Sequence, residues 1–115
     1  MASINIQPET LSLKSEGQWI TTHIELPQRY DASQIDISTV KLNNVVFAES
    51  NPEYGFVKNP EIKDRDENGL PELMVKFNRK ELINLLKNSQ FSLILTGRLK
   101  SGVELKAVDS INVIQ

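Results

Sequence analysis

The sequence predicts an all-β protein, an antiparallel immunoglobulin-like β-sandwich of about seven strands with one short crossover helix. Three observations support this prediction. Apolar and polar residues alternate through most of the chain, as they do in strands that have one buried face. Turn-forming residues interrupt the alternation at roughly the 8- to 12-residue spacing typical of sandwiches. Only residues 79–87 combine leucines at helical spacing with a capping signal.

The N-terminal part of the chain predicts two strands. Residues 4–13 alternate but contain Pro8, which has no amide hydrogen for a sheet ladder. We therefore expect an edge strand in two pieces, or a strand that changes partner. Residues 18–26 alternate without interruption up to Pro27. One face of this strand carries Ile20, Thr22, Ile24 and Leu26, and the other carries Trp19, Thr21, His23 and Glu25. Trp19 is expected to help hold the two sheets together.

The middle of the chain predicts a hairpin between two irregular stretches. Residues 30–38 form a polar connection with side chains suited to local turn bonds, namely Asp31, Ser33, Asp36 and Ser38. Strands are expected at 39–42 and 45–48, joined by a tight turn at Asn43-Asn44, because asparagine tolerates positive φ. Residues 49–63 contain two prolines and a glycine, and within them Tyr54, Phe56 and Val57 predict a short strand.

The C-terminal half predicts three strands and the helix. Residues 71–77 form a strand with Leu73, Val75 and Phe77 on one face and Met74 and Lys76 on the other. Asn78 is expected to cap a helix at 79–87, with Glu81 at the capping-box position and Phe77 and Leu82 as a hydrophobic staple. Strands at 90–99 and 103–114 flank a turn at 100–102. Asp109 interrupts the apolar face of the last strand, which predicts a bulge or a sheet edge.

Composition narrows the functions of what we expect to be a single domain over residues 1–115. The chain is 39% hydrophobic and 24% charged, which suits a soluble domain with its own core. Its 13 basic and 15 acidic residues argue against a nucleic-acid partner. The lack of cysteine excludes disulfides, zinc-cysteine sites and thiol nucleophiles. No stretch predicts membrane insertion, and the first residues lack a signal-peptide pattern. We expect either a cytoplasmic protein or a module of a longer exported chain.

Residues 64–72 carry the one metal-binding pattern, D-x-D-x-N-G-x-x-E. Calcium takes six to eight oxygen ligands, and alternate residues of a tight loop can direct theirs to one ion. The predicted ligands are Asp64, Asp66, Asn68, the carbonyl of Leu70, and Glu72. The position of the last EF-hand ligand is Val75, which offers no carboxylate, so bound calcium would stiffen a loop between strands. The alternative is a polar hairpin loop without metal, built on the turn at Asn68-Gly69.

No residue pattern predicts catalysis, and we expect no enzyme activity. His23 is the single histidine, without a cysteine or second histidine to complete a site, so a structural role is expected. A G-x-S-x-G nucleophile motif is absent from the sequence. Trp19, Tyr30, Tyr54 and Phe56 offer a different function, since aromatic rings on one face can bind sugars. A carbohydrate-binding module is therefore the alternative to a structural one.

Several stretches of the chain carry a resemblance. They are I-x-P-x-T-L-x-L-K-S-x-G-x-W-I-T from Ile6, I-E-L-P from Ile24, Y-D from Tyr30, I-D-x-S-T-V-x-L-N from Ile35, D-x-D-x-N-G-x-P-E-L-M-V-K-F from Asp64, and Thr96-Gly97. This pattern resembles β-sandwich modules of bacterial and archaeal secreted or cell-surface proteins. Such modules usually have Asp where Asn68 and Glu72 stand here. Both replacements keep a side-chain oxygen, but Asn68 removes a charge and should weaken an ion site.

The resemblance implies a non-catalytic role outside the cell. Similar modules often recur in tandem or lie beside dockerin-like and adhesion domains. By this resemblance the chain is a spacer or adhesion module, extracellular or on the cell surface as part of a longer precursor. Its partners would be neighbouring domains of the larger chain, surface proteins or glycans. The resemblance assigns no catalytic residue.

Overall fold

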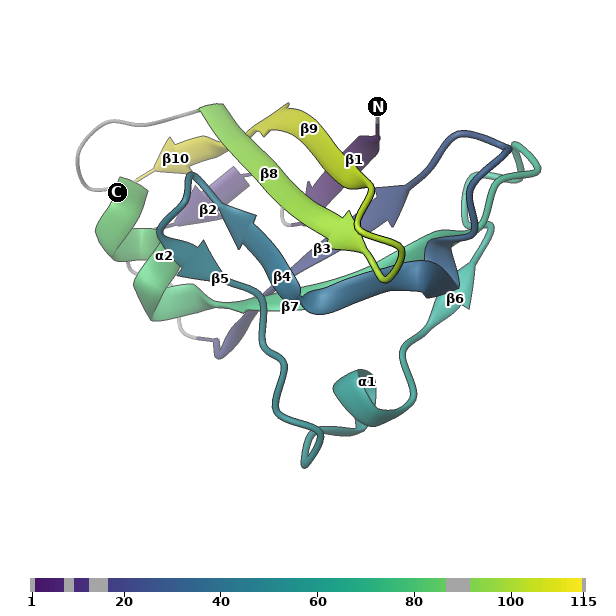
Figure 1. Ribbon diagram of the computed structural model, residues 1–115. Coiled ribbons are helices and arrows are strands. Elements are labelled where there is room, and N and C mark those ends of the chain that lie inside the picture. Colours follow the sequence, from purple (N-terminus) through teal and green to yellow (C-terminus); the bar gives the residue numbers. More distant parts are fainter. Residues whose placement is uncertain (1, 8–9, 13–16, 87–91, 115) are drawn as a thin grey trace.

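Two four-stranded sheets pack face to face in the computed structural model, which describes residues 2–7, 10–12, 17–86 and 92–114 (Figure 1). The first sheet has the order β1-β3-β7-β6, with bounds Ser3–Gln7, Trp19–Glu25, Glu72–Asn78 and Ile62–Lys63. The second has the order β5-β4-β8-β9, with bounds Val46–Phe47, Ile35–Leu42, Ser92–Leu99 and Glu104–Ser110. Every pairing within these two sheets is antiparallel. The predicted all-β sandwich is confirmed.

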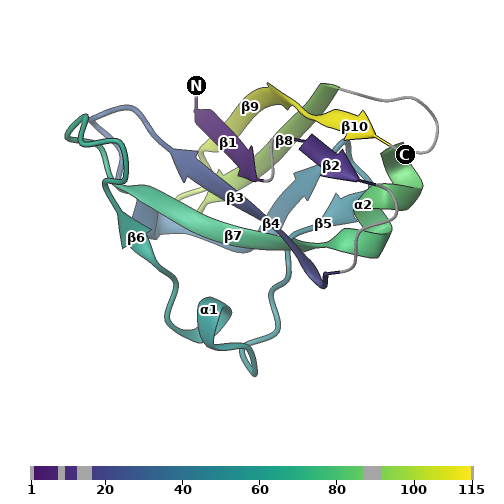
Figure 2. The same cartoon turned by 180° about the vertical axis from the view of Figure 1, so that it is seen from behind.

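The first and last strands both change partner along their length. After β1, strand β2 (Thr10–Ser12) pairs in parallel with β10 (Asn112–Ile114) at the other end of the chain (Figure 2). This confirms the expected switch of the N-terminal strand. The switch of the last strand follows Asp109, whose carboxylate accepts a hydrogen bond from the backbone amide of Ile6 at 3.1 Å. The polar residue that interrupts the apolar face thus marks the point where the strand leaves β8.

The core lies between the sheets and follows the predicted alternation. On β3, Ile20, Thr22 and Ile24 are buried, and β7 and β8 alternate in the same way. The side chains that face inward from β7, β8 and β9 are Leu73, Val75, Phe77, Leu93, Leu95, Leu99, Leu105 and Ala107. Val103 shares their parity but precedes β9 and is 38% exposed. Gly97 faces inward on β8, where an added Cβ would lie 3.1 Å from Val40 Cγ2.

Short backbone contacts tie the two sheets together along both sides of the sandwich. On one side, the Ala2 amide of the segment entering β1 donates to the Lys106 carbonyl of β9 at 3.2 Å. On the other side, the segment after β5 crosses between the sheets. The Ala48 amide donates to the Val40 carbonyl and the Glu49 amide to the Lys76 carbonyl, each at 2.9 Å. Ala48 also forms an isolated bridge with Phe77.

The predicted helix and hairpin turn are both present. Helix α2 spans Arg79–Leu86, and the Glu81 amide donates to Asn78 Oδ1 at 3.1 Å, which is the expected N-cap bond. Asn43 and Asn44 have φ values of 49° and 59°, as the tight turn between β4 and β5 requires. The end of the predicted helix at Lys87 and the start of the predicted strand at Gln90 and Phe91 lie outside the described residues.

Strand β4 begins at Ile35, four residues earlier than predicted, because Ile35 is buried opposite Leu99 of β8. The polar residues before Thr39 do form the expected local bonds: Asp31 accepts from Ser33, and Asp36 from Ser38. The first pair caps a short 3-10 helix at Ala32–Gln34. The second lies within β4, where the register with β8 shifts between Asp36 and Lys41. A strand with a bulge can contain local side-chain hydrogen bonds of the kind that is typical of turns. The turn-forming residues of this stretch therefore did not indicate that the strand had already begun.

The short strand predicted around Tyr54–Val57 is wrong, because Gly55–Lys58 form one helical turn, α1. The amides of Val57 and Lys58 both donate to the Tyr54 carbonyl at 3.0 Å. Strand β6 occupies the edge of β7 nearest to this segment, since Ile62 pairs with Leu73. The segment turns instead and carries its aromatic side chains onto the outer face of the first sheet.

Candidate functional site

The predicted metal loop, residues 64–72, is a tight turn organised by Asp64. The two carboxylate oxygens of Asp64 accept hydrogen bonds from the amides of Asn68 at 3.1 Å and Gly69 at 2.7 Å. Asn68 Oδ1 in turn accepts from the Leu70 amide at 2.9 Å. Glu67 and Gly69 have positive φ values of 57° and 87°. The Asn68 amide also donates to Asp66 Oδ1 at 3.4 Å. Three of the five predicted ligands, Asp64, Asp66 and Asn68, therefore use side-chain oxygens to stabilise the turn.

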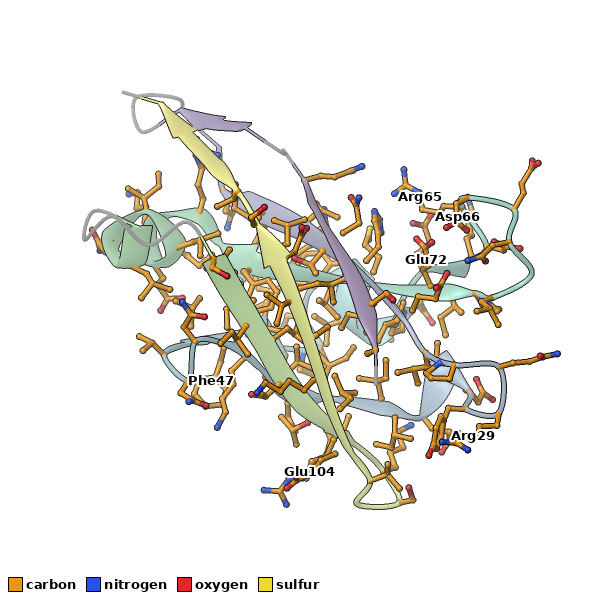
Figure 3. The ribbon with its side chains drawn as sticks, turned by 90° about the horizontal axis from the view of Figure 1, so that it is seen from above. Arg29, Phe47, Arg65, Asp66, Glu72 and Glu104 are labelled. Atoms are coloured by element: carbon orange, nitrogen blue, oxygen red, sulfur yellow. The ribbon has the colours of Figure 1, made fainter. Side chains whose placement is uncertain are left out.

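The acidic group that the structure assembles differs from the predicted set. Carboxylate oxygens of Glu25, Asp66 and Glu72 all lie within 4.8 Å of one another. Asp66 and Glu72 were predicted, whereas Glu25 comes from β3, where it lies directly opposite Glu72 of β7. Figure 3 shows Asp66 and Glu72 close together at one end of the first sheet. Glu25 could be identified as a member of this group only from the pairing of the strands at 18–26 and 71–77. The local sequence pattern does not reveal that pairing.

Like charges dominate the electrostatics of this acidic cluster of Glu25, Asp66 and Glu72. Burial raises the pKa of Glu72 above its ordinary value of 4.5, and the charges of Asp66 and Glu25 raise it further against the opposing effect of Arg65. One oxygen of Glu25 accepts a hydrogen bond from Asn68 Nδ2 at 2.5 Å. Like charges directly opposite each other on neighbouring strands destabilise a sheet. The cluster therefore favours either a proton or a cation, and carboxylate oxygens are the ligands that calcium prefers.

His23 lies beside this cluster on β3 and anchors the loop to the sheet. Its side chain is 3% exposed, and the Arg65 guanidinium of the loop donates a hydrogen bond to its Nε2 atom. Arginine is always a donor, so Nε2 is the acceptor and the imidazole is neutral. Burial lowers the pKa of His23 below 6.5, and Arg65 lowers it further. Glu61 partly opposes these effects, and Lys76 adds a smaller lowering. This geometry gives His23 the predicted structural role.

Three of the four predicted aromatic residues gather at the other end of the same outer face. Trp19 lies 5.2 Å from both Tyr54 and Phe56 between ring centroids, edge-on at 83° and 73°, while Tyr54 and Phe56 stack at 5.3 Å. All three side chains are half-buried. Trp19 was expected to lie between the sheets, but it lies on the outer face of the first sheet. There it packs against α1 and the residue before it, and so holds α1 against β3. Tyr30 is not a member of this cluster, and the Arg29 guanidinium lies 5.2 Å from its ring.

Comparison of the chain with protein-family models, with curated proteins and with solved structures finds no match. Among the described residues, no helix is long and apolar enough to cross a membrane.

Proposed function

We propose that this chain is a non-catalytic spacer or adhesion module of an exported prokaryotic protein. The observation that carries the proposal is the path of the chain through the sandwich. Ser3 of β1 pairs with Glu25 at the end that bears the acidic loop, whereas Ile114 of β10 pairs with Ser12 beyond the far end of β1. The two termini are therefore separated along the sandwich in both views (Figures 1 and 2). When the chain enters a domain at one end and leaves it toward the other, similar domains can be joined to it in a linear array.

The strand order supports an immunoglobulin-like topology within this proposal. The order β1-β3-β7-β6 corresponds to strands A, B, E and D of an immunoglobulin sheet, and β5-β4-β8-β9 to C′, C, F and G. The proposed spacer role is tested by small-angle X-ray scattering on two copies joined by a short linker. We expect a maximum dimension close to twice the 40 Å long axis of one copy. A compact particle, with the two copies folded back side by side, would contradict the role as a spacer.

Calcium at the acidic cluster is the second part of the proposal. Glu25, Asp66 and Glu72 supply convergent carboxylates, and the loop that carries Asp66 joins β6 to β7, so an ion there would fasten the loop to β3. A ligand that binds only the folded state stabilises it and so raises the melting temperature. At a ligand concentration of 100 times the dissociation constant, the gain in the free energy of unfolding is about 2.7 kcal/mol. We therefore expect a higher melting temperature in millimolar calcium than in chelator.

A matched pair of variants makes this test specific. Glu25→Gln removes one charge from the acidic cluster and should abolish the calcium-dependent gain. Glu53→Gln removes one charge from an exposed position outside the cluster and should keep it. An equal gain in both variants, or no gain in the unmodified protein, would refute calcium binding at this cluster. Neither result bears on the role as a spacer.

Carbohydrate binding is the second candidate function, favoured by the gathering of Trp19, Tyr54 and Phe56 on one face. It requires that sugars reach the rings, although these rings cover parts of one another. Titration with oligosaccharides, followed by Trp19 fluorescence, tests it. Saturable quenching that is lost in Tyr54→Ala would support this candidate. Fluorescence unaffected by sugars and protected from acrylamide would dispose of it.

A further inference from the structure

The outer face of the second sheet presents a row of exposed apolar side chains. Strand register places Ile94 of β8 directly opposite Val108 of β9, and Phe47 of β5 opposite Lys41 of β4. Phe47 is 53% exposed, Val108 59% and Ile94 39%, while Val45 beside them is 64% exposed. Among the described residues, these are four of the six large hydrophobic side chains that are exposed. Such a concentration on one sheet is typical of an interaction surface.

Three basic side chains, Lys41, Arg98 and Lys106, lie on the same side of the sheet as these apolar residues. We call the apolar and basic residues together the basic face. Thr96 of β8 lies between Lys41 and Lys106 in the strand register, and Arg98 follows on the same side. Two adjoining hollows of about 640 and 540 Å³ share Asn44, Thr96 and Lys106 as lining residues. Within the part of the chain that the structure describes, Glu104 is the one acidic residue that lines either hollow. Glu104 and Asp36 both lie opposite Arg98 in the strand register, so Lys41 and Lys106 give the face its positive charge. The basic face therefore suits an acidic partner segment that also carries apolar side chains.

The chain itself presents such a segment at a distant position. The loop at 64–72 carries Asp64, Asp66, Glu67 and Glu72 around Leu70 and Pro71, and its acidic cluster includes Glu25. Figure 3 shows Asp66 and Glu72 on one side of the molecule, with Phe47 and Glu104 on the other. The loop of one copy can therefore reach the basic face of another while its own basic face stays open. Two basic faces packed on each other would instead bring lysines together, which costs affinity.

We propose that the basic face of one copy binds the acidic 64–72 loop of a second copy, in a head-to-tail contact. Because different surfaces of the two copies meet, the contact can repeat along a chain of molecules. A loop of this size covers less than the roughly 800 Å² per partner of a stable interface, so separate copies should associate weakly, with a dissociation constant on the order of 0.1–1 mM. Linked copies would associate far more readily through their high effective concentration. The inference does not depend on the function proposed above.

Two charge-reversed variants test the contact by sedimentation velocity at low ionic strength, in chelator so that no metal occupies the loop. The face variant is Lys41→Glu with Lys106→Glu, and the loop variant is Glu67→Lys with Glu72→Lys. We expect the unmodified protein to associate as its concentration rises, and each variant alone to remain monomeric. An equimolar mixture of the two variants should associate again, because the intact loop of the face variant meets the intact face of the loop variant, and the reversed face and reversed loop are also opposite in charge.

The control for the face variant is Lys58→Glu with Lys80→Glu, which makes the same charge change at exposed positions of α1 and α2. This control should associate like the unmodified protein, and each variant should keep its cooperative thermal unfolding. The proposal is overturned if the unmodified protein stays monomeric up to about 1 mM, the weak end of the expected range. It is also overturned if the control loses association equally, or if the loop variant alone still associates, which would indicate face-to-face pairing.

Discussion

Replacing Glu72 by Gln should stabilise the protein at neutral pH, although Glu72 lies on an inner strand of the first sheet. The carboxylates of Glu25 and Asp66 lie within 4.8 Å of that of Glu72. At this separation, two unit charges repel by about 0.9 kcal/mol in water and about 3.5 kcal/mol at an effective dielectric constant of about 20. Because Glu25 and Glu72 are only half-buried, solvent screening places the value near the lower limit. We expect Glu72→Gln to raise the free energy of unfolding by about 1 kcal/mol, or roughly 4 °C in melting temperature.

The pH dependence of this gain identifies its cause. The folded protein binds the Glu72 proton more tightly than the unfolded chain, because burial and the neighbouring carboxylates raise the pKa of Glu72. The contribution of Glu72 to the stability of the unmodified protein should therefore rise as pH falls from the raised pKa toward 4.5, and the advantage of Glu72→Gln should shrink over the same range. High salt should shrink it too.

Urea unfolding at pH 7 and pH 4, in low and high salt, measures these differences, with Glu53→Gln as the control at an exposed site outside the cluster. The control should change stability little at either pH. If Glu72→Gln destabilises the protein at pH 7, or changes stability equally at both pH values, repulsion within the acidic cluster is not the governing interaction.

Three further changes probe the fold around the site. The contribution of His23 to stability should be lost as pH drops below 6.5, because the folded state holds His23 neutral while the unfolded chain takes up a proton. His23→Gln, compared by urea unfolding between pH 7 and 5, should lack this component. Gly97→Ala should cost about 1–3 kcal/mol, since the new Cβ would lie 3.1 Å from Val40 Cγ2, and an unchanged urea midpoint would contradict this close packing. Asn78→Ala should cost about 1 kcal/mol, because the Glu81 amide loses its acceptor, and hydrogen exchange at the start of α2 should quicken; unaltered exchange would argue against the cap.

Much of the fold could be predicted because it depends on local patterns. Alternation identified the inward faces of β3, β7 and β8, since side chains on a strand point to opposite faces in turn. Pro8 predicted an edge strand in two pieces or a change of strand partner, because proline conflicts with a continuous ladder. Asp109 predicted a bulge or a sheet edge, because it interrupts the apolar face, and the last strand leaves β8 just after it. Asn78 predicted the start of α2 from the capping pattern alone.

The remaining features depend on contacts between distant residues. Glu25 joins Asp66 and Glu72 only because β3 pairs with β7 in one particular register. Trp19 has the spacing of an outward-facing residue, but its burial comes from Tyr54 and Phe56, which reach it from a segment that was predicted to be a strand. Whether that segment extends or turns is decided by β6, which already occupies the adjacent strand edge. No local propensity contains this information.

The backbone contacts along the two sides of the sandwich also protect the protein against aggregation. A free strand edge is a template on which another chain can add a strand. Here β1 lies against β9 on one side, where Asp109 accepts the Ile6 amide, and the crossing at Ala48 occupies part of the other side. The outermost strands β5 and β6 are two residues long, too short to seed such an addition. Copies of this domain can therefore be crowded along one filament or surface without their sheets merging.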